Sequence, residues 1–437
     1  MTLFGIAWRN IRQRALTSGL TALSLALGVA LVVATLVTAG IVKQAFNSGA
    51  GLGYNMIVGA KGSPLQLVLN SVYLISRPIE NVSWTFYEQF LPAEGRRDGQ
   101  AGTFAGSVKT AVPICMGDYF RGYRVVGTNA AYFDRLSYGN GQPFAFAGGE
   151  NFRDADFFGG VLGSDVARTL GLKVGDAFSP THGADDGLVH DPFIVRGVLA
   201  RTDTPVDRGV YVNMEGFYLQ EGHAKPVEGA EFATKREPAE TADGTPSPLP
   251  AEQREVTAIL VETASLPGLP PELTAMGLKQ AINEGRDGQA AEPIREIRQL
   301  LDLFVRPLEL LLLLVTALVV VVSAIGILVS MVGSALERSR DVAVMRALGA
   351  RRGHVLATVL IEAILLAVGG GIAGWALGHA VVAAIGPLIT TGAGVTASFF
   401  STSPAELLLV PFLVGLAILA ALLPALSAYR TDVSRWL

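Results

Sequence analysis

Two histidines and three aspartates in one short segment are the residues of this chain whose types could bind a metal ion. His182 and His190 lie with Asp185, Asp186 and Asp191 in a segment that is also rich in glycine. Imidazole and carboxylate groups are ligands for Zn²⁺. Their spacing matches no closed zinc motif, and a solvated loop, a hairpin or a contact with a partner explains the same composition. We therefore expect no metal site and keep these five residues as candidates.

Motifs for catalysis or for nucleotide binding are absent from the sequence. It contains no G-x-S-x-G, no H-E-x-x-H and no paired cysteines. It also lacks G-x-x-x-x-G-K-[ST], and Gly59-Ala60-Lys61-Gly62-Ser63 does not have the spacing of a P-loop. We expect no catalytic residue, no cofactor site and no enzymatic activity in this chain. Its one cysteine, Cys115, excludes an internal disulfide and is expected to be a structural thiol.

A charged block, residues 337–351, lies between two apolar stretches and is the most informative feature of the sequence. Its apolar residues recur at spacings of about three and four with charges between them, which predicts a docked amphipathic helix. Such a helix at a membrane surface indicates a protein partner; the alternative is that the charges only anchor a loop at the lipid headgroups. The residues that we expect to make the contact are Glu337, Arg338, Arg340, Asp341, Met345, Arg346 and Gly349.

The composition predicts a membrane protein. The chain is 50% hydrophobic and only 16% charged, with a mean hydropathy of +0.42, whereas soluble proteins are about 25% charged. Uncharged runs occupy residues 17–42, 310–336 and 407–428, and a fourth stretch, 355–389, is interrupted only by Glu362 and His379. Each is long enough to cross a bilayer. The first is too long for the apolar core of a signal peptide, so we expect a retained anchor.

The distribution of charge predicts the topology. The segments 1–16, 337–354 and 429–437 hold ten Lys and Arg residues against three acidic ones, and the loop 386–403 has no Lys or Arg. The positive-inside rule then places both termini and the charged block in the cytoplasm. The long segment between the first and second spans is therefore outside the cytoplasm, and it has a net negative charge.

The external segment reads as an α+β domain. Ser164 or Asp165 can cap a short helix that follows a strand ending near Leu162, and Gly171 can end that helix. Further strands are predicted at residues 192–199, 209–212 and 254–262. From Ile294 the pattern becomes helical and leads into the second span, with Pro307 expected to kink the helix.

A stripe of small residues predicts close helix packing. The third predicted span has three glycines at intervals of four, and the first span has alanines at the same spacing. Packing within one chain and a dimer interface both account for this stripe. The glycines are Gly370, Gly374 and Gly378; the alanines are Ala22, Ala26, Ala30 and Ala34.

The predicted fold is thus an α-helical membrane protein with four transmembrane helices and a large extracytoplasmic α+β domain inserted between the first two. The expected segments are a cytoplasmic interfacial helix 1–16, spans 17–42, 307–336, 353–386 and 405–428, the external domain 43–293 with a stalk helix 294–306, the cytoplasmic coupling helix 337–352, an external loop 387–404 and a cytoplasmic tail 429–437.

Four motifs in this order resemble the permeases of the MacB/FtsX/LolC–LolE superfamily. Trp8-Arg9-Asn10-Ile11, before the first span, resembles the opening of these permeases, and the pattern at 162–176 resembles part of their extracytoplasmic domain. The other two motifs are Glu337-Arg338-x-Arg340-Asp341-x-Ala343-x-x-Arg346-Ala347-Leu348-Gly349-Ala350, with Glu362-Ala363 after it, and Leu423-Pro424-Ala425-x-x-Ala428-Tyr429-Arg430-x-Asp432-Val433.

The resemblance implies a type VII ABC permease of the bacterial inner membrane, which works by mechanotransmission. It implies cytoplasmic ATPase subunits of the LolD/MacB type that bind ATP and Mg²⁺, and a second permease copy or paralogue. A periplasmic partner and the lipid bilayer complete the expected partners; no nucleic acid is expected. The implied function is the export or extraction of a periplasmic or membrane substrate.

Two alternative functions use the same parts. One is an FtsX-like regulator that signals to a periplasmic enzyme without transport. The other is a metal-related transport permease, because residues 54–81 and 204–208 resemble a narrower subgroup whose operons encode small secreted or metal-related proteins.

Overall fold

The computed structural model describes residues 2–50, 52–139, 141–183, 187–225, 239–240, 246–337 and 350–393, and short stretches between 402 and 422. The chain divides into two compact units. One is formed by Met1–Lys43 with Asp302–Leu437, and the other by Gln44–Leu301. Each unit is described by itself.

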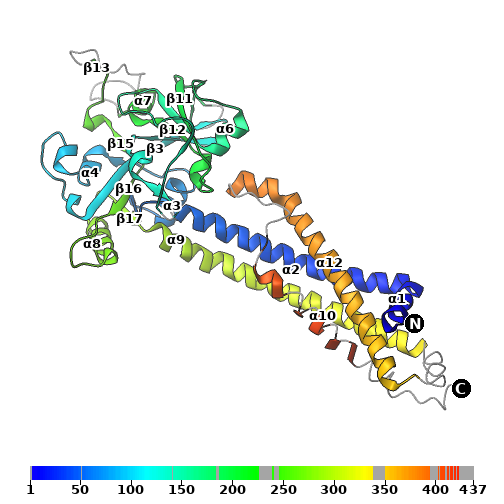
Figure 1. Ribbon diagram of the computed structural model, residues 1–437. Coiled ribbons are helices and arrows are strands. Elements are labelled where there is room, and N and C mark those ends of the chain that lie inside the picture. Colours follow the sequence, from blue (N-terminus) through cyan, green and yellow to red (C-terminus); the bar gives the residue numbers. More distant parts are fainter. Residues whose placement is uncertain are drawn as a thin grey trace. The chain divides into compact units, whose positions relative to one another are not determined.

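Long apolar helices form most of the first unit (Figure 1). They are α1 (Leu3–Gln13), α2 (Ala15–Ala50), α10 (Arg306–Glu337) and α12 (Arg352–Ala393), with a 3₁₀ turn at Pro404–Leu408. Among the described residues, three helical stretches are long and apolar enough to cross a membrane: Ala15–Gln44, Pro293–Gly326 and Gly353–Gly386. The expected fourth span, 405–428, falls largely outside the described residues, and so does most of the expected coupling helix, 337–352.

The glycine stripe of α12 faces the alanine stripe of α2. A Cβ atom on Gly370 would lie 2.8 Å from the Ala22 carbonyl oxygen, and one on Gly374 would lie 2.4 Å from that of Ala26. One on Gly378 would lie 2.8 Å from the Val33 Cβ. Only glycine permits this approach, so the stripe is used for packing within the chain.

Several polar side chains inside these helices have polar partners. His379, which is fully buried, lies 2.9 Å from Glu406 Oε2, and the Trp375 indole donates to the same oxygen. Asn10 of α1 donates to Glu362 of α12. Polar groups in a membrane segment are costly unless they pair in this way.

The helical segment before Pro307 contains a change of winding. Helix α9 (Pro293–Leu300) is followed by a π-helical turn at Leu301–Val305, and α10 begins at Arg306. Proline has no N–H and its ring clashes with the carbonyl of residue i−4, so a regular α-helical bond cannot form here. Just before Pro307, where a kink is expected, the structure has this π turn.

The second unit is built on a mixed β-sheet, which Figure 1 shows around β3 and β12. Its eleven strands within the described residues follow the order β17-β1-β16-β3-β4-β12-β8-β11-β7, with β10 beside β3 and β9 beside β11. The strands are β1 (Met56–Gly59), β3 (Val108–Phe120), β4 (Tyr123–Thr128), β7 (Phe146–Gly149), β8 (Gly159–Leu162), β9 (Ala177–Phe178), β10 (Thr181–His182), β11 (Phe193–Leu199), β12 (Val210–Asn213), β16 (Ala258–Thr263) and β17 (Gln289–Ala291).

Short helices and small strand pairs complete this unit. The helices are α3 (Pro64–Ser71), α4 (Trp84–Glu88), α5 (Ala131–Arg135), α6 (Ser164–Leu170), α7 (Met214–Leu219), α8 (Pro271–Glu284) and α9. The small pairs are β2 (Val82–Ser83) with β15 (Glu255–Val256), β5 (Ser137–Tyr138) with β6 (Gln142–Pro143), and β13 (Ala239–Glu240) with β14 (Pro246–Ser247).

Both faces of the sheet are covered. In β1, Met56 and Val58 belong to one buried hydrophobic cluster and Ile57 to a second. Because side chains alternate along a strand, the two clusters lie on opposite faces. All four residues of β1 are buried, as expected for a strand with both faces covered.

Most of the local elements predicted for this unit are confirmed. Strand β8 ends at Leu162, α6 begins at Ser164, and Gly171 ends it in the left-handed conformation, with φ of 69°. The expected cap is wrong: the N-cap of α6 is Gly163, which makes no side-chain cap, because the helix already begins at Ser164. The strands predicted near 192–199 and 209–212 are β11 and β12. The strand predicted over 254–262 is divided into β15 and β16.

Candidate functional site

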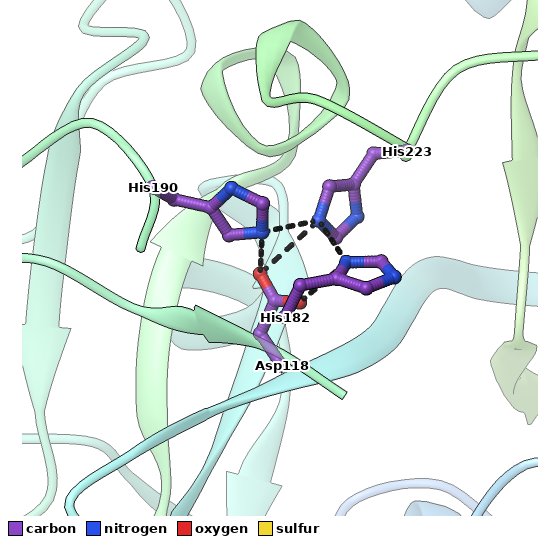
Figure 2. Close-up of side chains that lie close together, drawn as sticks. All are labelled: Asp118, His182, His190 and His223. Carbon is purple, nitrogen blue, oxygen red and sulfur yellow. Dashed lines mark hydrogen bonds and ion pairs between the residues drawn. The ribbon is translucent and has the colours of Figure 1, made fainter. Parts of the chain in front are cut away.

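Four side chains with metal-binding chemistry converge at one end of β3. They are Asp118, His182, His190 and His223, and one nitrogen or carboxylate oxygen of each lies within 4.8 Å of the others. Figure 2 shows the three imidazole rings turned toward the carboxylate and toward one another. This is the only such group of His, Cys, Asp and Glu found among the described residues.

Strand pairing positions two of the histidines. In the antiparallel pairing of β10 with β3, His182 lies opposite Asp118, and opposite residues place their side chains close together. The chain then returns as a hairpin, in which the His182 N–H donates to the Leu188 carbonyl and the His190 N–H donates to that of Pro180. His190 thereby comes back beside the same carboxylate.

The third histidine is positioned by the turn that follows α7. Gly222 has a φ of 87°, a conformation that favours glycine, and it allows the chain to turn immediately before His223. The His223 ring packs against Phe217 of α7, with ring centroids 4.1 Å apart. Gln220 in the same turn accepts a hydrogen bond from the Asp191 N–H, which ties this turn to the hairpin.

A β-bulge directs Asp118 into the cluster. The register of β3 against β4 shifts between Met116 and Tyr119. Met116 belongs to one hydrophobic cluster, whereas Phe120, also an even-numbered residue, belongs to the other. The bulge therefore reverses which face of the sheet these side chains cover, and bulges of this kind commonly re-aim a side chain at a functional site.

The distances within the cluster are short and nearly equal. His223 Nε2 lies 3.2 Å from Asp118 Oδ2, 3.2 Å from His182 Nδ1 and 3.0 Å from His190 Nε2. Asp118 Oδ2 lies 3.4 Å from His190 Nε2, and Asp118 Oδ1 lies 3.4 Å from His182 Nδ1. Nitrogen and oxygen atoms thus surround one central point.

The electrostatics of the cluster favour a charged carboxylate among imidazoles. Burial alone would raise the pKa of Asp118, but the three neighbouring imidazoles hold it well below its usual range. Asp118 in turn raises the pKa of His182. Burial lowers the pKa of His223, which favours its neutral form. Neutral imidazole and ionised carboxylate are the forms that can bind a metal.

The cluster coincides only partly with the residues that the sequence suggested. His182 and His190 belong to it. Asp191 does not: its backbone N–H bonds to Gln220, and its side chain is not part of the group. Asp185 and Asp186 lie outside the described residues.

Asp118 and His223 were missed by the reasoning from the sequence. Asp118 is fully buried in an apolar strand, Val108–Phe120, and a carboxylate in such a position costs free energy unless it has a partner. His223 is one of only five histidines in the chain. The signals in the sequence are an acidic residue within an apolar strand and a histidine in a chain with few histidines. The residues that neighbour Asp118 and His223 in sequence do not indicate that the two lie close together.

The expected ATPase-contacting residues are not placed by the structure. Glu337 is the last residue of α10. Arg338, Arg340, Asp341, Met345, Arg346 and Gly349 lie outside the described residues.

Comparison with known proteins gives matches to both parts of the chain. The model of the MacB-like periplasmic core domain matches residues 18–245, which is more than half of the chain, and the model of the FtsX-like permease C-terminal region matches residues 313–433. The macrolide export ATP-binding/permease protein MacB of Chlorobium luteolum is 29% identical over 177 residues, covering 35% of this chain and 26% of that protein. The chain thus spans about a quarter of the length of this relative.

Proposed function

Because this chain belongs to the MacB/FtsX superfamily of ABC transporter permeases, we propose that it is the membrane subunit of a system driven by a separate ATPase. ATP hydrolysis in the cytoplasm would move its periplasmic domain, which exports or extracts a periplasmic or membrane substrate. The order of the two family matches carries this proposal: a periplasmic core domain precedes the FtsX-like region, and apolar helices accompany both.

The ATPase that we propose as the partner is a separate protein. The relative has an ATP-binding part in its name, yet the aligned region covers only 26% of that protein. The present sequence has no P-loop motif to bind the phosphates of ATP. A cytoplasmic ABC ATPase of the LolD/MacB type is therefore the proposed partner, and ATP and Mg²⁺ would bind to it. This chain supplies no catalytic group of its own.

The proposed route for the motion is the helical segment from the periplasmic domain to the charged block. The chain is helical from Pro293 through the π turn to Glu337, where the charged block begins. A ligand shifts a conformational equilibrium only through different contacts in the two states. The charges at Arg338, Arg340, Asp341 and Arg346 would supply such contacts to the ATPase.

The membrane arrangement belongs to the same proposal. We place the protein in the bacterial inner membrane with four spans, both termini in the cytoplasm and a second permease copy or paralogue beside it. The excess of Lys and Arg in 1–16, 337–354 and 429–437 supports this orientation.

Reconstitution with the ATPase tests the proposal. The chain and an ABC ATPase of the LolD/MacB type would be purified together in lipid nanodiscs, and the ATPase rate would be measured with and without the permease. We expect the permease to change the rate, and Arg346→Glu to reduce this effect roughly 30-fold, as for the loss of an interface residue worth about 2 kcal/mol.

The control is Arg435→Glu, which makes the same charge reversal in the C-terminal tail and should leave the effect intact. Membrane insertion of both variants is checked by their level in purified membranes. An ATPase rate that is indifferent to the permease would overturn the proposal, and equal rates for wild type and Arg346→Glu would exclude the proposed contact.

A further inference from the structure

We propose that Asp118, His182, His190 and His223 bind one divalent transition-metal ion, Zn²⁺ in preference, in a four-coordinate site of the periplasmic domain. The site is separate from ATPase coupling, so its failure would leave the proposed function untouched. The distances between the side chains, the hydrogen atoms available to them and the nature of the ligands support this site.

The distances match the edges of a tetrahedron around zinc. Zinc–nitrogen bonds of about 2.0–2.1 Å separate tetrahedral ligands by about 3.3 Å. Five distances between nitrogen and oxygen atoms of the four residues range from 3.0 to 3.4 Å; three of them end on His223 Nε2, and each Asp118 oxygen lies 3.4 Å from one further imidazole nitrogen.

The position of His223 distinguishes a tetrahedral from a square-planar arrangement of ligands. In a square-planar site each ligand atom faces another about 4.1 Å away, twice the bond length. His223 Nε2 lies within 3.0–3.2 Å of Asp118 Oδ2, His182 Nδ1 and His190 Nε2, so it has no ligand opposite. The position of His223 therefore argues against a square-planar site, which favours zinc over square-planar Cu²⁺ or Ni²⁺.

Hydrogen bonds alone do not account for the convergence. A neutral imidazole nitrogen either carries a hydrogen atom and donates it, or accepts one. His223 Nε2 faces three close polar atoms and can satisfy only one of them as a donor. Both oxygens of Asp118 are buried and have no well-aligned hydrogen-bond donor among the described residues. A cation satisfies all four groups together, because each directs a lone pair toward it.

The ligand set selects the class of ion. Mg²⁺ and Ca²⁺ prefer oxygen ligands, and three of these four residues offer nitrogen. Imidazole nitrogen with one carboxylate suits Zn²⁺. Four protein ligands fill a tetrahedral shell and leave no position for a substrate or a reactive water, so the ion has a structural rather than a catalytic role.

The ion would connect three separate parts of the chain. Asp118 lies in β3, His182 and His190 lie in the hairpin that begins with β10, and His223 follows α7. The His182 side chain is 45% exposed, whereas those of His190 and Asp118 are each 1% exposed. The ion therefore enters from the His182 side and holds the hairpin and the turn against β3.

Metal content of the full chain tests the site directly. The protein is purified in detergent through a tag without histidine, stripped with a chelator, loaded with Zn²⁺ and desalted. We expect one zinc ion per chain. His182→Ala, chosen because an exposed residue is least needed for folding, should lower the zinc affinity roughly 100-fold or more. His354→Ala, at an exposed histidine outside the cluster, is the matched control.

Cobalt provides a second measurement that reports geometry. Co²⁺ in a tetrahedral nitrogen and oxygen site absorbs visible light strongly, whereas six-coordinate Co²⁺ absorbs weakly. We expect the strong spectrum with wild type and with His354→Ala, and its loss with His182→Ala and with Asp118→Asn. Binding below one ion per chain, zinc retention by His182→Ala equal to that of the control, or a six-coordinate spectrum would each overturn the proposal.

Discussion

Asp118 Oδ2 lies 3.2 Å from His223 Nε2, although the two residues come from distant parts of the chain. The approach depends on the bulge in β3 and on the turn at Gly222. Since each residue is held by a different element, a bond from both to one ion would join those elements directly.

Zinc is accordingly expected to stabilise the folded chain. A ligand present at 100 times its dissociation constant stabilises the native state by about 2.7 kcal/mol. For a domain of this size each kcal/mol raises the Tm by about 2–4 °C, so a rise of about 5–10 °C is expected. Thermal unfolding of the full chain with zinc and with chelator measures it. His223→Ala should unfold at one temperature in both conditions; a zinc-dependent rise in that variant would contradict the linkage.

Close packing of α12 on α2 should make Gly374 sensitive to a single methyl group. In Gly374→Ala the new Cβ would meet the Ala26 carbonyl oxygen at 2.4 Å, and overpacking of this kind costs about 1–3 kcal/mol. Gly369→Ala, five residues earlier on the same helix, meets nothing within 4 Å and should gain up to about 1 kcal/mol of helix propensity. Thermal unfolding in detergent should order the two variants on opposite sides of wild type.

The buried ion pair of Arg254 with Glu215 should matter more than an exposed one. Arg254 also lies over the Trp84 ring, 3.6 Å from its centroid, and its side chain is 5% exposed. Arg254→Leu leaves the carboxylate of Glu215 buried without its partner, which costs about 3–5 kcal/mol. Arg201→Leu breaks an exposed pair with Asp203 and should cost at most about 1 kcal/mol. Equal changes of Tm in the two variants would refute this ranking.

Asp207 should be required for the loop that precedes β12. Its carboxylate accepts hydrogen bonds from the Thr202 N–H, the Thr202 hydroxyl and the Asp203 N–H. Asp207→Ala leaves these donors without their acceptor, and each buried unsatisfied group costs about 1–3 kcal/mol. Asp207→Asn keeps one acceptor oxygen, so it should lower the Tm less than alanine does. The prediction fails if the two variants unfold together.

Cys115 should resist alkylation in the native state. Burial raises the pKa of its thiol to about 12, whereas an ordinary cysteine has a pKa of about 8.5. At pH 9 the thiol is therefore protonated in the folded chain and largely ionised in the unfolded one, and the thiolate is the reactive form.

The sign of the pH dependence follows from this difference. The contribution of Cys115 to stability is complete below about pH 8.5 and is lost as the pH rises toward 12. Alkylation at pH 9 should be slow in native protein and fast in denaturant. Since the chain has one cysteine, the rate has a single source; similar rates in both conditions would argue for an accessible thiol.

The elements that sequence predicted best are those specified by neighbouring residues. Gly171 ends α6 because glycine adopts positive φ readily, and this requires no information from the rest of the chain. Likewise, a proline disturbs any helix that contains it in its interior, so the effect of Pro307 can be expected from the sequence alone. The apolar runs of α2, α10 and α12 were equally visible, because bilayer length is a property of one segment.

The candidate site could be predicted only in part, because it depends on strand pairing across long distances. His182 and His190 are near in sequence and were recognised together. Asp118 joins them only because β10 pairs with β3, and His223 only because β12, which α7 follows, lies in the same sheet. The local sequence around Asp118 contains no sign of either partner.

The glycines of α12 can serve only one neighbour at a time. Gly370, Gly374 and Gly378 already receive the backbone of α2 so closely that a single methyl group would collide with it. A second permease using the same glycines would have to displace α2 from its own chain. Dimerisation that leaves each subunit intact must therefore rely on other surfaces, and substitutions at these three glycines would report on the folding of a subunit before they report on its association.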